Sequence, residues 1–482
     1  MGNPFGGLEP KLVWKWFGAL TQVPRPSGSE KKAIEFFEGF AASHGFAVRK
    51  DKVGNVLICV PGSKGRQKDE VLVLQGHMDM VGEKNEDVTF NFETDPIQVW
   101  RDGDWLKARG TTLGADNGIG LALAMALATD PEVSRPPLEI LCTVDEERGL
   151  TGAFNLEPGF VTGRRMINID SEEEGTVFVG CAGGGDTQCL FPLKLAPLPD
   201  KWTGIKVKVL GLAGGHSGLN IIENRANALK LLSTLLLEAC PTEKFSLCSL
   251  LGGDKHNAIP REATALLAGP ADLADRIRAA VERLRPGFQA EYGKTDPKLD
   301  IQVSAAGVTD GLSFDDSLRF LSLLLALPHG VDAMSRDIPG LVETSSNLAK
   351  VGWGEDSALV HNSSRSSVAA ALARMRSKVA AAGRLAHADV QQLPGYPGWQ
   401  PNMESALLAK TREVYLATTG KTAKVTAIHA GLECGIIGEK YSGMDMISIG
   451  PDMHGVHSPD ERLSIPSTAR FYSFLKALVA KI

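Results

Sequence analysis

The sequence has no apolar run of roughly 18 residues or more, so no segment is expected to span a membrane. It also lacks an excess of positive charge. The formal net charge of −6 gives no electrostatic reason to expect nucleic acid or an anionic membrane as a partner. The first residues show no apolar signal-peptide core, and Gly6 stands where a myristoylation signal needs Ser or Thr. These absences predict a cytoplasmic protein.

Paired cysteine motifs are missing as well. The seven cysteines include no CxxC pair, and an odd number without such pairs is typical of reduced cytosolic thiols. The composition, 43% hydrophobic and 22% charged, is that of an ordinary globular protein. A chain of 482 residues exceeds the size at which one core usually stops growing, so two domains are expected.

The first two hundred residues alternate strand-like and helix-like runs, which predicts an α/β architecture with a central mixed sheet flanked by helices. Three short apolar runs end at His77, at Glu146–Glu147 and at Asp170. A buried helix over 118–128 begins just after Asp116. Polar groups directly past strand ends are where open α/β sheets place their sites. We therefore expect these residues to form one site.

The pattern changes near residue 203, where alternating strands and amphipathic helices predict an inserted α+β domain. The alternating run that begins at Ile205 recurs 94 residues later at Leu299, and helices follow in the same order. This indicates two βαββα repeats. The α/β character returns near residue 388. The predicted domains are therefore a catalytic domain in two segments, 1–202 and 388–482, and an inserted duplicated lid domain over 203–387.

The α/β part offers five candidate metal ligands, in a mixture of imidazole and carboxylate that suits zinc and, less exclusively, manganese or cobalt. They are His77, Asp116, Glu147, Asp170 and His457. Five ligands are too many for one tetrahedral catalytic zinc but fit two ions that share a bridging carboxylate and polarise one water. We expect two Zn²⁺ per chain, with Mn²⁺ or Co²⁺ as possible substitutes.

Two further carboxylates have roles beside these ligands. Of the adjacent pair Glu146 and Glu147, one can bind metal while the other takes the proton from the water as general base. Asp79 stands two residues after His77 and can accept the second N–H of that imidazole, which fixes the tautomer.

Five motifs resemble the zinc aminoacylase/carboxypeptidase superfamily, and more closely its aminoacyl-histidine dipeptidase branch (Xaa-His dipeptidases, bacterial carnosinase-like). They are HMDMV at 77–81, TTLGADNG at 111–118, DEERGLTGA at 145–153, NIDSEEEG at 168–175 and HGVHSPDE at 454–461. The resemblance covers nearly the whole chain. It implies that Asp116 bridges, that His77 and Asp170 complete one metal and Glu147 and His457 the other, and that the Asp116–Asn117 bond is cis. It also implies Glu146 as the base and Asp79 as the orienting carboxylate.

The same resemblance implies roles for the lid. His216, in GGHSG, matches a histidine that donates a hydrogen bond to the tetrahedral oxyanion. Asn257 matches a substrate-contacting asparagine, and Arg365 an arginine that pairs with the free carboxylate of the substrate. His429 and Glu433, in HAGLECG, are expected near the mouth of the pocket.

The expected function is metal-dependent hydrolysis of dipeptides, with Xaa-His dipeptides as a candidate substrate class. An N-acyl amino acid amidohydrolase on the same centre is an alternative within enzymes. A non-catalytic metal-binding interaction protein is an alternative of another class, disfavoured because Glu146 and all five ligands are present. The expected partner is a small peptide, with no nucleic acid and no membrane. The chain is expected to be a monomer or a homodimer in which one chain builds its whole site, since His216 and Asn257 lie in the first lid copy and Arg365 in the second.

Overall fold

The computed structural model describes residues 3–240 and 244–482, and the chain forms two compact units. The first unit comprises Met1–Cys181, Trp399–Ala427 and Leu432–Ile482, and the second comprises Ala182–Gly398 and Ile428–Gly431. The second unit is therefore inserted into the first. Its main segment runs over 182–398 instead of the expected 203–387, because strands on both sides of the expected range pair within its sheet. None of the helices in the described ranges is long and apolar enough to cross a membrane.

The first unit is built around an eight-stranded sheet in the order β1-β2-β6-β3-β7-β21-β8-β20. Its strands are β1 (Ala47–Lys50), β2 (Val56–Val60), β3 (Leu72–His77), β6 (Leu138–Thr143), β7 (Arg165–Asn168), β8 (Thr176–Cys181), β20 (Lys424–Ile428) and β21 (Asp445–Ser448). Strands β6, β3, β7 and β21 are parallel to one another. A second sheet, in the order β22-β23-β5-β4, contains β4 (Val99–Asp102), β5 (Trp105–Ala108), β22 (Met453–His454) and β23 (Arg462–Ser464).

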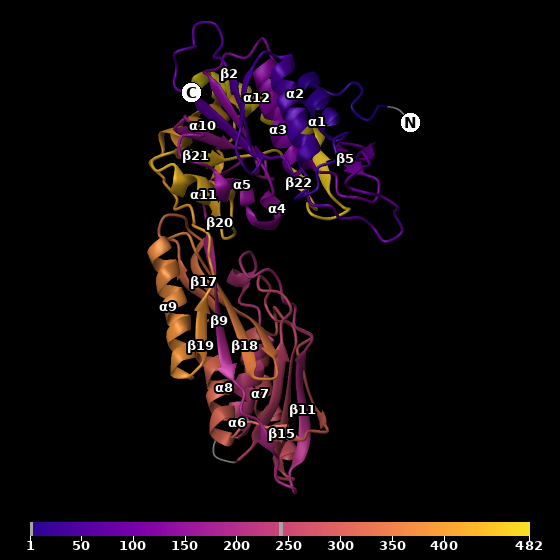
Figure 1. Ribbon diagram of the computed structural model, residues 1–482, viewed down its shortest axis with the longest axis vertical. Coiled ribbons are helices and arrows are strands. Elements are labelled where there is room, and N and C mark those ends of the chain that lie inside the picture. The colour runs from indigo at the N-terminus through magenta and orange to yellow at the C-terminus, as the bar shows by residue number, and fades with distance from the viewer. Residues whose placement is uncertain (1–2, 241–243) are drawn as a thin grey trace. The chain divides into compact units, whose positions relative to one another are not determined.

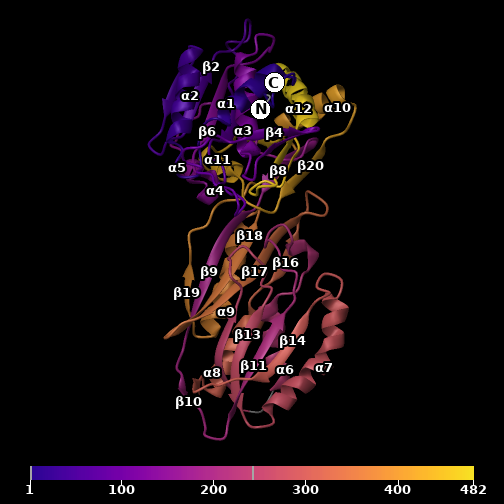
Figure 2. The same cartoon turned by 90° about the vertical axis from the view of Figure 1, so that its right-hand side faces the viewer.

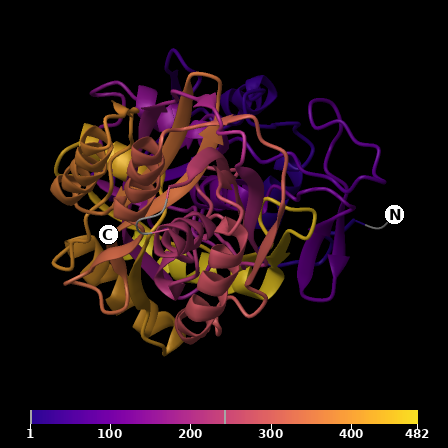
Figure 3. The ribbon, with the colours of Figure 1, turned by 90° about the horizontal axis from the view of Figure 1, so that it is seen from below.

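The helices of this unit are α1 (Lys11–Leu20), α2 (Lys31–Ser43), α3 (Ala115–Thr129), α4 (Glu146–Gly149), α5 (Thr151–Asn155), α10 (Ala406–Thr419), α11 (Glu433–Lys440) and α12 (Ile465–Lys481). Helix α3 is apolar on all sides and buried from Ala115 to Ala128, as a central core helix should be. The C-terminal segment joins the first segment through the pairs β21–β7 and β23–β5 (Figures 1 and 3). Segments far apart in the sequence therefore contribute strands to the same sheets.

The second unit contains a sheet in the order β14-β11-β13-β12-β17-β18-β9-β19, with β16 paired to β17 (Figure 2). Its strands are β9 (Gly183–Pro192), β11 (Thr203–Leu210), β12 (Ser246–Gly252), β13 (Ala263–Gly269), β14 (Asp300–Ala305), β16 (Gly330–Met334), β17 (Val342–Trp353), β18 (Ser357–Ser366) and β19 (Asp389–Gln392). Its helices are η1 (Ile221–Glu223), α6 (Ala228–Ala239), α7 (Leu273–Tyr292), α8 (Phe314–Ala326) and α9 (Ala369–Leu385).

The sheet contains two halves with the same internal order, but the copies are nested and not tandem. One half is β14-β11-β13-β12, and the other, read from its own outer edge, is β19-β9-β18-β17. Strand β9 is thus the first strand of the second copy, and the whole first copy is inserted between β9 and α8. The short strands β10 (Ala196–Pro197) and β15 (Asp310–Gly311) pair antiparallel where the nested copy leaves and rejoins the chain.

The expected repeat aligned the strand near residue 299 with the strand near residue 205, and this alignment is wrong. Strand β14 closes the first copy by pairing with β11. Both strands alternate apolar and polar residues, and alternation does not distinguish the first strand of a copy from the last. The two halves meet where β12 and β17 pair at Gly252 and Val351.

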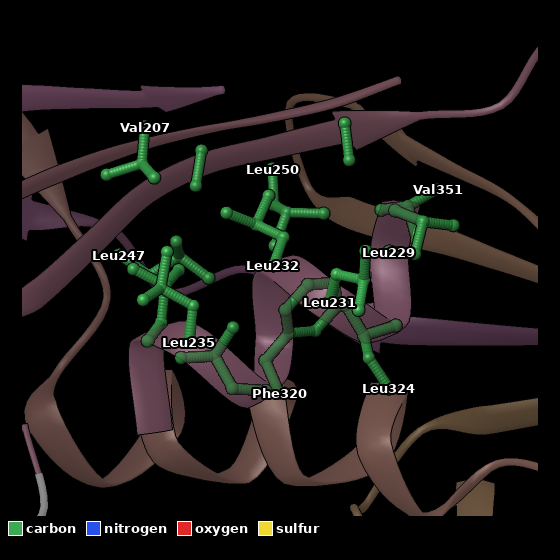
Figure 4. Packing of buried hydrophobic residues seen from close by; sticks show 14 of the residues in the cluster. Val207, Leu229, Leu231, Leu232, Leu235, Leu247, Leu250, Phe320, Leu324 and Val351 are labelled. Carbon is green, nitrogen blue, oxygen red and sulfur yellow. The ribbon is translucent and has the colours of Figure 1, made fainter. Parts of the chain in front are cut away.

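A single core joins the four long helices to one face of this sheet. Figure 4 shows the part of this core where α6 and α8 pack against the strands. Leu232 of α6 and Phe320 of α8 belong to it, together with Val207 of β11 and Val360 of β18. Since side chains alternate along a strand, the intervening residues lie on the face without these helices. That helix-free face bears most of the lid residues considered below.

Candidate active site

Three strand ends of the first unit bring ligands to one edge of the sheet. His77 is the last residue of β3, Asp170 follows β7, and Glu146 and Glu147 open α4 directly after β6. Strand β3 runs parallel to both β6 and β7, so their carboxyl ends lie at the same edge. The polar residues that follow these three strands in the sequence therefore lie close together in the structure.

Asp116 connects two groups of potential metal ligands. One group is His77, Asp116 and Asp170, the other is Asp116, Glu147 and His457, and within each group the ligand atoms lie within 4.8 Å of one another. Asp116 Oδ1 is 3.0 Å from His77 Nε2, while Asp116 Oδ2 is 3.0 Å from His457 Nε2. Each oxygen of one carboxylate thus faces a different imidazole, which is the arrangement of a bridging ligand.

The remaining contacts complete each group. Asp170 Oδ1 lies 3.3 Å from His77 Nε2, and Glu147 Oε2 lies 2.9 Å from His457 Nε2. Glu147 Oε1 and Asp170 Oδ1 are buried and have no hydrogen-bond donor. Buried carboxylate oxygens without donors are costly unless a cation satisfies them. Imidazole nitrogens and carboxylate oxygens at these positions fit divalent metal ions.

The ligands themselves indicate that protons and metals compete for this site. Hydrogen bonds to Asp116 and Glu147 raise the pKa of His457 to about 11. Burial disfavours the charged form of His77, but the charge of Asp170 and the hydrogen bond with Asp116 hold its pKa well above the ordinary value. These raised pKa values favour the protonated imidazoles in the metal-free protein, so metal binding must release protons.

Asp79 lies behind the ligands and positions two of them. Its Oδ1 is 3.4 Å from His77 Nδ1, and its two oxygens accept the backbone N–H groups of Glu146 and Glu147 at 3.1 and 3.3 Å. Burial opposes ionisation of Asp79, but the hydrogen bond and charge of His77 lower its pKa to about 2. The side chain is therefore an ionised anchor that holds His77 and the start of α4 together.

Glu146 is close to the ligands without belonging to either group. It can share a ligand group with His77 and Glu147, so its carboxylate reaches the same space. Burial, together with the negative charges of Asp170 and Glu433, raises its pKa well above the ordinary value. A carboxylate whose pKa is shifted toward neutrality is suited to taking and returning a proton.

Two buried residues that the sequence analysis missed hold Asp116 and the residues around it in place. The Glu461 carboxylate accepts the backbone N–H groups of residues 113–116, at 2.6, 3.0, 2.7 and 3.2 Å. Arg25, 2% exposed, donates to the carbonyls of Met78 and Asp79 at 3.1 and 2.8 Å and also to that of Gly114. Glu461 could have been found from the sequence, because it lies in the same motif as His457. No sequence motif pointed to Arg25.

The backbone is unusual at several of these positions. The Asp116–Asn117 peptide bond is cis, as the resemblance implied. Asp145, just before Glu146, and His457 have φ of 51° and 61°, a left-handed conformation that non-glycine residues rarely adopt. Such conformations cluster where a side chain must be aimed at a functional site. Gly76 is required for another reason, since a Cβ there would lie 2.1 Å from Asn117 Oδ1.

Glu433 differs from its expected place at a pocket mouth. It is 0% exposed, and its carboxylate accepts from Gln75 Nε2 at 2.6 Å and from Thr143 Oγ1 at 2.7 Å. Burial raises its pKa to about 7. These contacts place Glu433 under the ends of β3 and β6, where its charge acts on the ligands and no surface remains for a substrate.

In the second unit, His216 and Asn257 are brought together by backbone contacts. His216 pairs with Ala258 as an isolated bridge, and Ser217 N donates to Asn257 O at 2.8 Å. His216 Nδ1 accepts the backbone N–H groups of Gly218 and Leu219 at 3.2 and 3.1 Å. The proton of the neutral ring must therefore be on Nε2. Burial and the charge of Arg365 lower the pKa of His216 to about 4, so it is a neutral Nε2–H donor at neutral pH.

Arg365 lies on the helix-free face of β18 and is 7% exposed. Its Nη1 donates to the hydroxyl of Tyr396 at 2.9 Å, and its Nε has no hydrogen-bond partner. Across the described ranges, no carboxylate forms an ion pair with it. His429 lies nearby, with Nε2 2.7 Å from Ser345 Oγ, and burial and the charge of Arg365 lower its pKa to about 3. A buried guanidinium surrounded by neutral imidazoles is a site for an anion.

Comparison with known proteins identifies the class. The model of Peptidase family M20/M25/M40 matches residues 73–481, and the chain belongs to this family. It is thus an enzyme, a metallopeptidase. Its paired ligand groups agree with the metal dependence of the family.

Particular relatives are similar over their whole length. The chain is 39% identical over 476 residues to the cytosol non-specific dipeptidase of Escherichia coli, covering 98% of each chain. The crystal structure of aminoacylhistidine dipeptidase from Vibrio alginolyticus superposes with a TM-score of 0.92 at 37% identity, covering 100% of this chain and 98% of that one. The aminopeptidase PepT structure from Bacillus cereus, at 13% identity and a TM-score of 0.56 over 99% of each chain, shares the fold. The resemblance drawn from the motifs is confirmed.

Proposed function

We propose that this chain is a cytoplasmic dipeptidase that uses two zinc ions and accepts a broad range of dipeptides, Xaa-His among them. The observation that carries the metal count is Asp116, whose two oxygens each face a different imidazole at 3.0 Å. The substrate class is supported by the full-length relatives, of which one is named a non-specific dipeptidase and the other an aminoacylhistidine dipeptidase. The name of the Escherichia coli relative also supports the cytoplasm as location.

In this proposal, each step of peptide hydrolysis is assigned to a particular group of the site. The ions, when bound to the two groups that share Asp116, would polarise the peptide carbonyl and lower the pKa of a water to near 7. Glu146 takes the proton of that water and returns it to the leaving amine. His216 donates from Nε2–H to the oxyanion, a role for which its fixed tautomer and neutral ring are suited.

Substrate length is set by the anion site of the second unit. Arg365 pairs with the α-carboxylate of the substrate, because its guanidinium is buried and its Nε has no hydrogen-bond partner among the described residues. Asn257 and His429 contact the substrate beside it. Glu433 acts indirectly, through Gln75 and Thr143, on the strands that bear the metal ligands.

We also propose that one chain supplies all these groups, so that a monomer is active whether or not the protein dimerises. The charge of Arg365, from the second lid copy, lowers the pKa of His216, from the first copy. The nested copies thus bring together within one chain the residues that two lids would otherwise have to supply.

A substrate panel tests the proposal. Zinc-loaded protein is assayed with dipeptides that include Xaa-His, with tripeptides, and with N-acetyl amino acids. We expect kcat/KM to be highest for dipeptides with a free carboxylate. A higher kcat/KM for N-acetyl amino acids would favour the amidohydrolase, and no hydrolysis of any of these substrates would favour a non-catalytic metal-binding protein.

A further inference from the structure

A second cluster of potential metal ligands lies on the helix-free face of the second unit. In the pairing of β9 with β18, Asp186 lies opposite Ser363 and Gln188 opposite His361. Cys189 and Val360 on the same strands point into the helix-covered core. By the alternation of side chains, Asp186, Gln188 and His361 therefore share the opposite face. This cluster has no residue in common with the groups around Asp116.

A third side chain reaches this cluster from the segment between β12 and β13. His256 Nδ1 lies 3.2 Å from Asp186 Oδ2, and His361 Nε2 lies 3.1 Å from the same oxygen. The three ligand atoms are all within 4.8 Å of one another. Adjacent ligands of a tetrahedral zinc with bonds of about 2.1 Å are about 3.4 Å apart, so two imidazoles and one carboxylate already have nearly this spacing.

The orientation of His361 is not explained by a simple ion pair. The residue is 9% exposed, and within residues 3–240 and 244–482 its Nε2 has no hydrogen-bond partner of good geometry, although Asp186 Oδ2 is only 3.1 Å away. The direction of the ring nitrogen therefore does not suit an N–H donor to that oxygen. A lone pair directed at an ion beside the carboxylate accounts for both the short distance and the missing hydrogen bond.

Gln188 is placed to interact with the second ring nitrogen of His361, Nδ1. His361 Nδ1 is 3.5 Å from Gln188 Nε2. As assigned, the amide nitrogen of Gln188 donates to Nδ1. The two ends of an amide side chain are assigned from their contacts, and a flip of this amide turns its carbonyl toward Nδ1 as an acceptor for the ring N–H. A ligating histidine commonly donates its second N–H in this way. That tautomer leaves Nε2 free for a metal.

We propose that Asp186, His256 and His361 form a third cation site, which binds a divalent transition-metal ion of the zinc class. Two imidazoles and one carboxylate favour zinc over calcium or magnesium, which prefer oxygen ligands. The His256 side chain is 59% exposed, so the ion can enter from solvent and keep water at its remaining position.

The site would act on substrate binding through the loop that bears it. His256 immediately precedes Asn257, and His361 lies four residues before Arg365 on β18. An ion bound to all three ligands ties the segment between β12 and β13 to β9 and β18. It would thereby fix Asn257 relative to Arg365 within the second unit.

The test counts zinc bound to chelator-stripped protein by elemental analysis after gel filtration. Wild type and the exposed control His387→Asn should each bind one ion more per chain than His256→Gln and His361→Gln. Because His256 is exposed, His256→Gln should fold even if His361→Gln does not. Equal zinc content in wild type and His256→Gln would overturn the proposal and leave Asp186 with an ion pair only.

The same measurement in an Asp116→Ala background separates this site from the catalytic metals. That variant should retain the third ion, and Asp116→Ala combined with His256→Gln should lose it. In addition, zinc should slow amide hydrogen exchange over 253–259 in Asp116→Ala but not in the double variant. Unchanged exchange in both proteins would contradict the proposal, whatever the fate of the catalytic ions.

Discussion

His457 Nε2 lies 3.0 Å from Asp116 Oδ2, although 341 positions separate the two residues in the sequence. The contact joins the C-terminal segment to the start of α3 across the inserted unit. Either residue alone would be unremarkable. Together with the second oxygen of Asp116 on His77, they define the centre on which the proposed chemistry depends.

Replacement of Glu146 by Gln should preserve the fold and the bound metal but lower kcat by about 10²–10⁴-fold, since an amide of nearly the same shape cannot take a proton. KM should change little, because the loss is in the transition state. Steady-state kinetics with a dipeptide measure both constants, and Glu86→Gln, on an exposed residue, is the control. Retention of the wild-type kcat would assign the base to another group.

Replacement of Arg365 by Met should remove the preference for a free carboxylate. Hydrogen bonds to charged groups contribute about 1.5–3 kcal/mol, so KM for dipeptides should rise about 10–100-fold. The ratio of kcat/KM between a dipeptide and its amide should fall toward one. The exposed Arg374→Met is the matched control. If Arg365→Met still discriminates as wild type does, the carboxylate is bound elsewhere.

His216→Ala should lower kcat by about 10²–10³-fold through loss of the oxyanion donor. Mixing this variant with Glu146→Gln, under conditions that allow subunit exchange, should leave the mixture inactive, because each chain is expected to use its own His216. The readout is activity relative to the unmixed variants. Substantial recovery would show that His216 works across a dimer.

Metal binding should release protons, because the histidine pKa values are raised in the metal-free protein. His457, with a pKa of about 11, is expected to be protonated at pH 7 in the metal-free protein, and the raised pKa of His77 favours its protonated form as well. Each must lose its proton to bind metal. Calorimetry in buffers of different ionisation enthalpy should therefore show proton release at pH 7, and His457→Gln should reduce it by about one proton per chain. An unchanged release would contradict the protonated state assigned to His457.

The same shifts predict how the metal-free protein responds to pH. A histidine whose pKa is raised on folding stabilises the folded state fully below its unfolded pKa of about 6.5. That contribution is lost as the pH rises toward the folded value of about 11 for His457. The melting temperature of chelator-stripped protein should fall across this range more steeply for wild type than for His457→Gln.

The sequence predicted which candidate ligands the structure groups together because all five belong to local motifs, and three of them follow apolar strands. His77 after β3 and Asp170 after β7 show this directly. Strand pairing was less accessible. Strand β9 pairs with β18, residues 183–192 with residues 357–366, and no local pattern specifies that partner. The nested arrangement of the lid copies was therefore missed.

Residues that act through hydrogen bonds to the backbone could not be predicted from the sequence either. Arg25 donates to three carbonyls and Glu461 accepts four N–H groups, and such partners leave no trace in the side-chain pattern. Glu433 was placed at a pocket mouth by motif alone. Its burial follows from the packing of α11 against the sheet, which only the fold reveals.

The shared role of Asp116 is tested most directly by comparing zinc content and dipeptidase activity in wild type, Asp116→Ala and Glu147→Ala. Counting ions as a difference from wild type makes the result independent of any third site. Asp116→Ala should contain two fewer ions per chain and show no activity, whereas Glu147→Ala should mainly lose one ion. Loss of one ion or none in Asp116→Ala, or wild-type turnover without those ions, would contradict a two-metal centre bridged by this carboxylate.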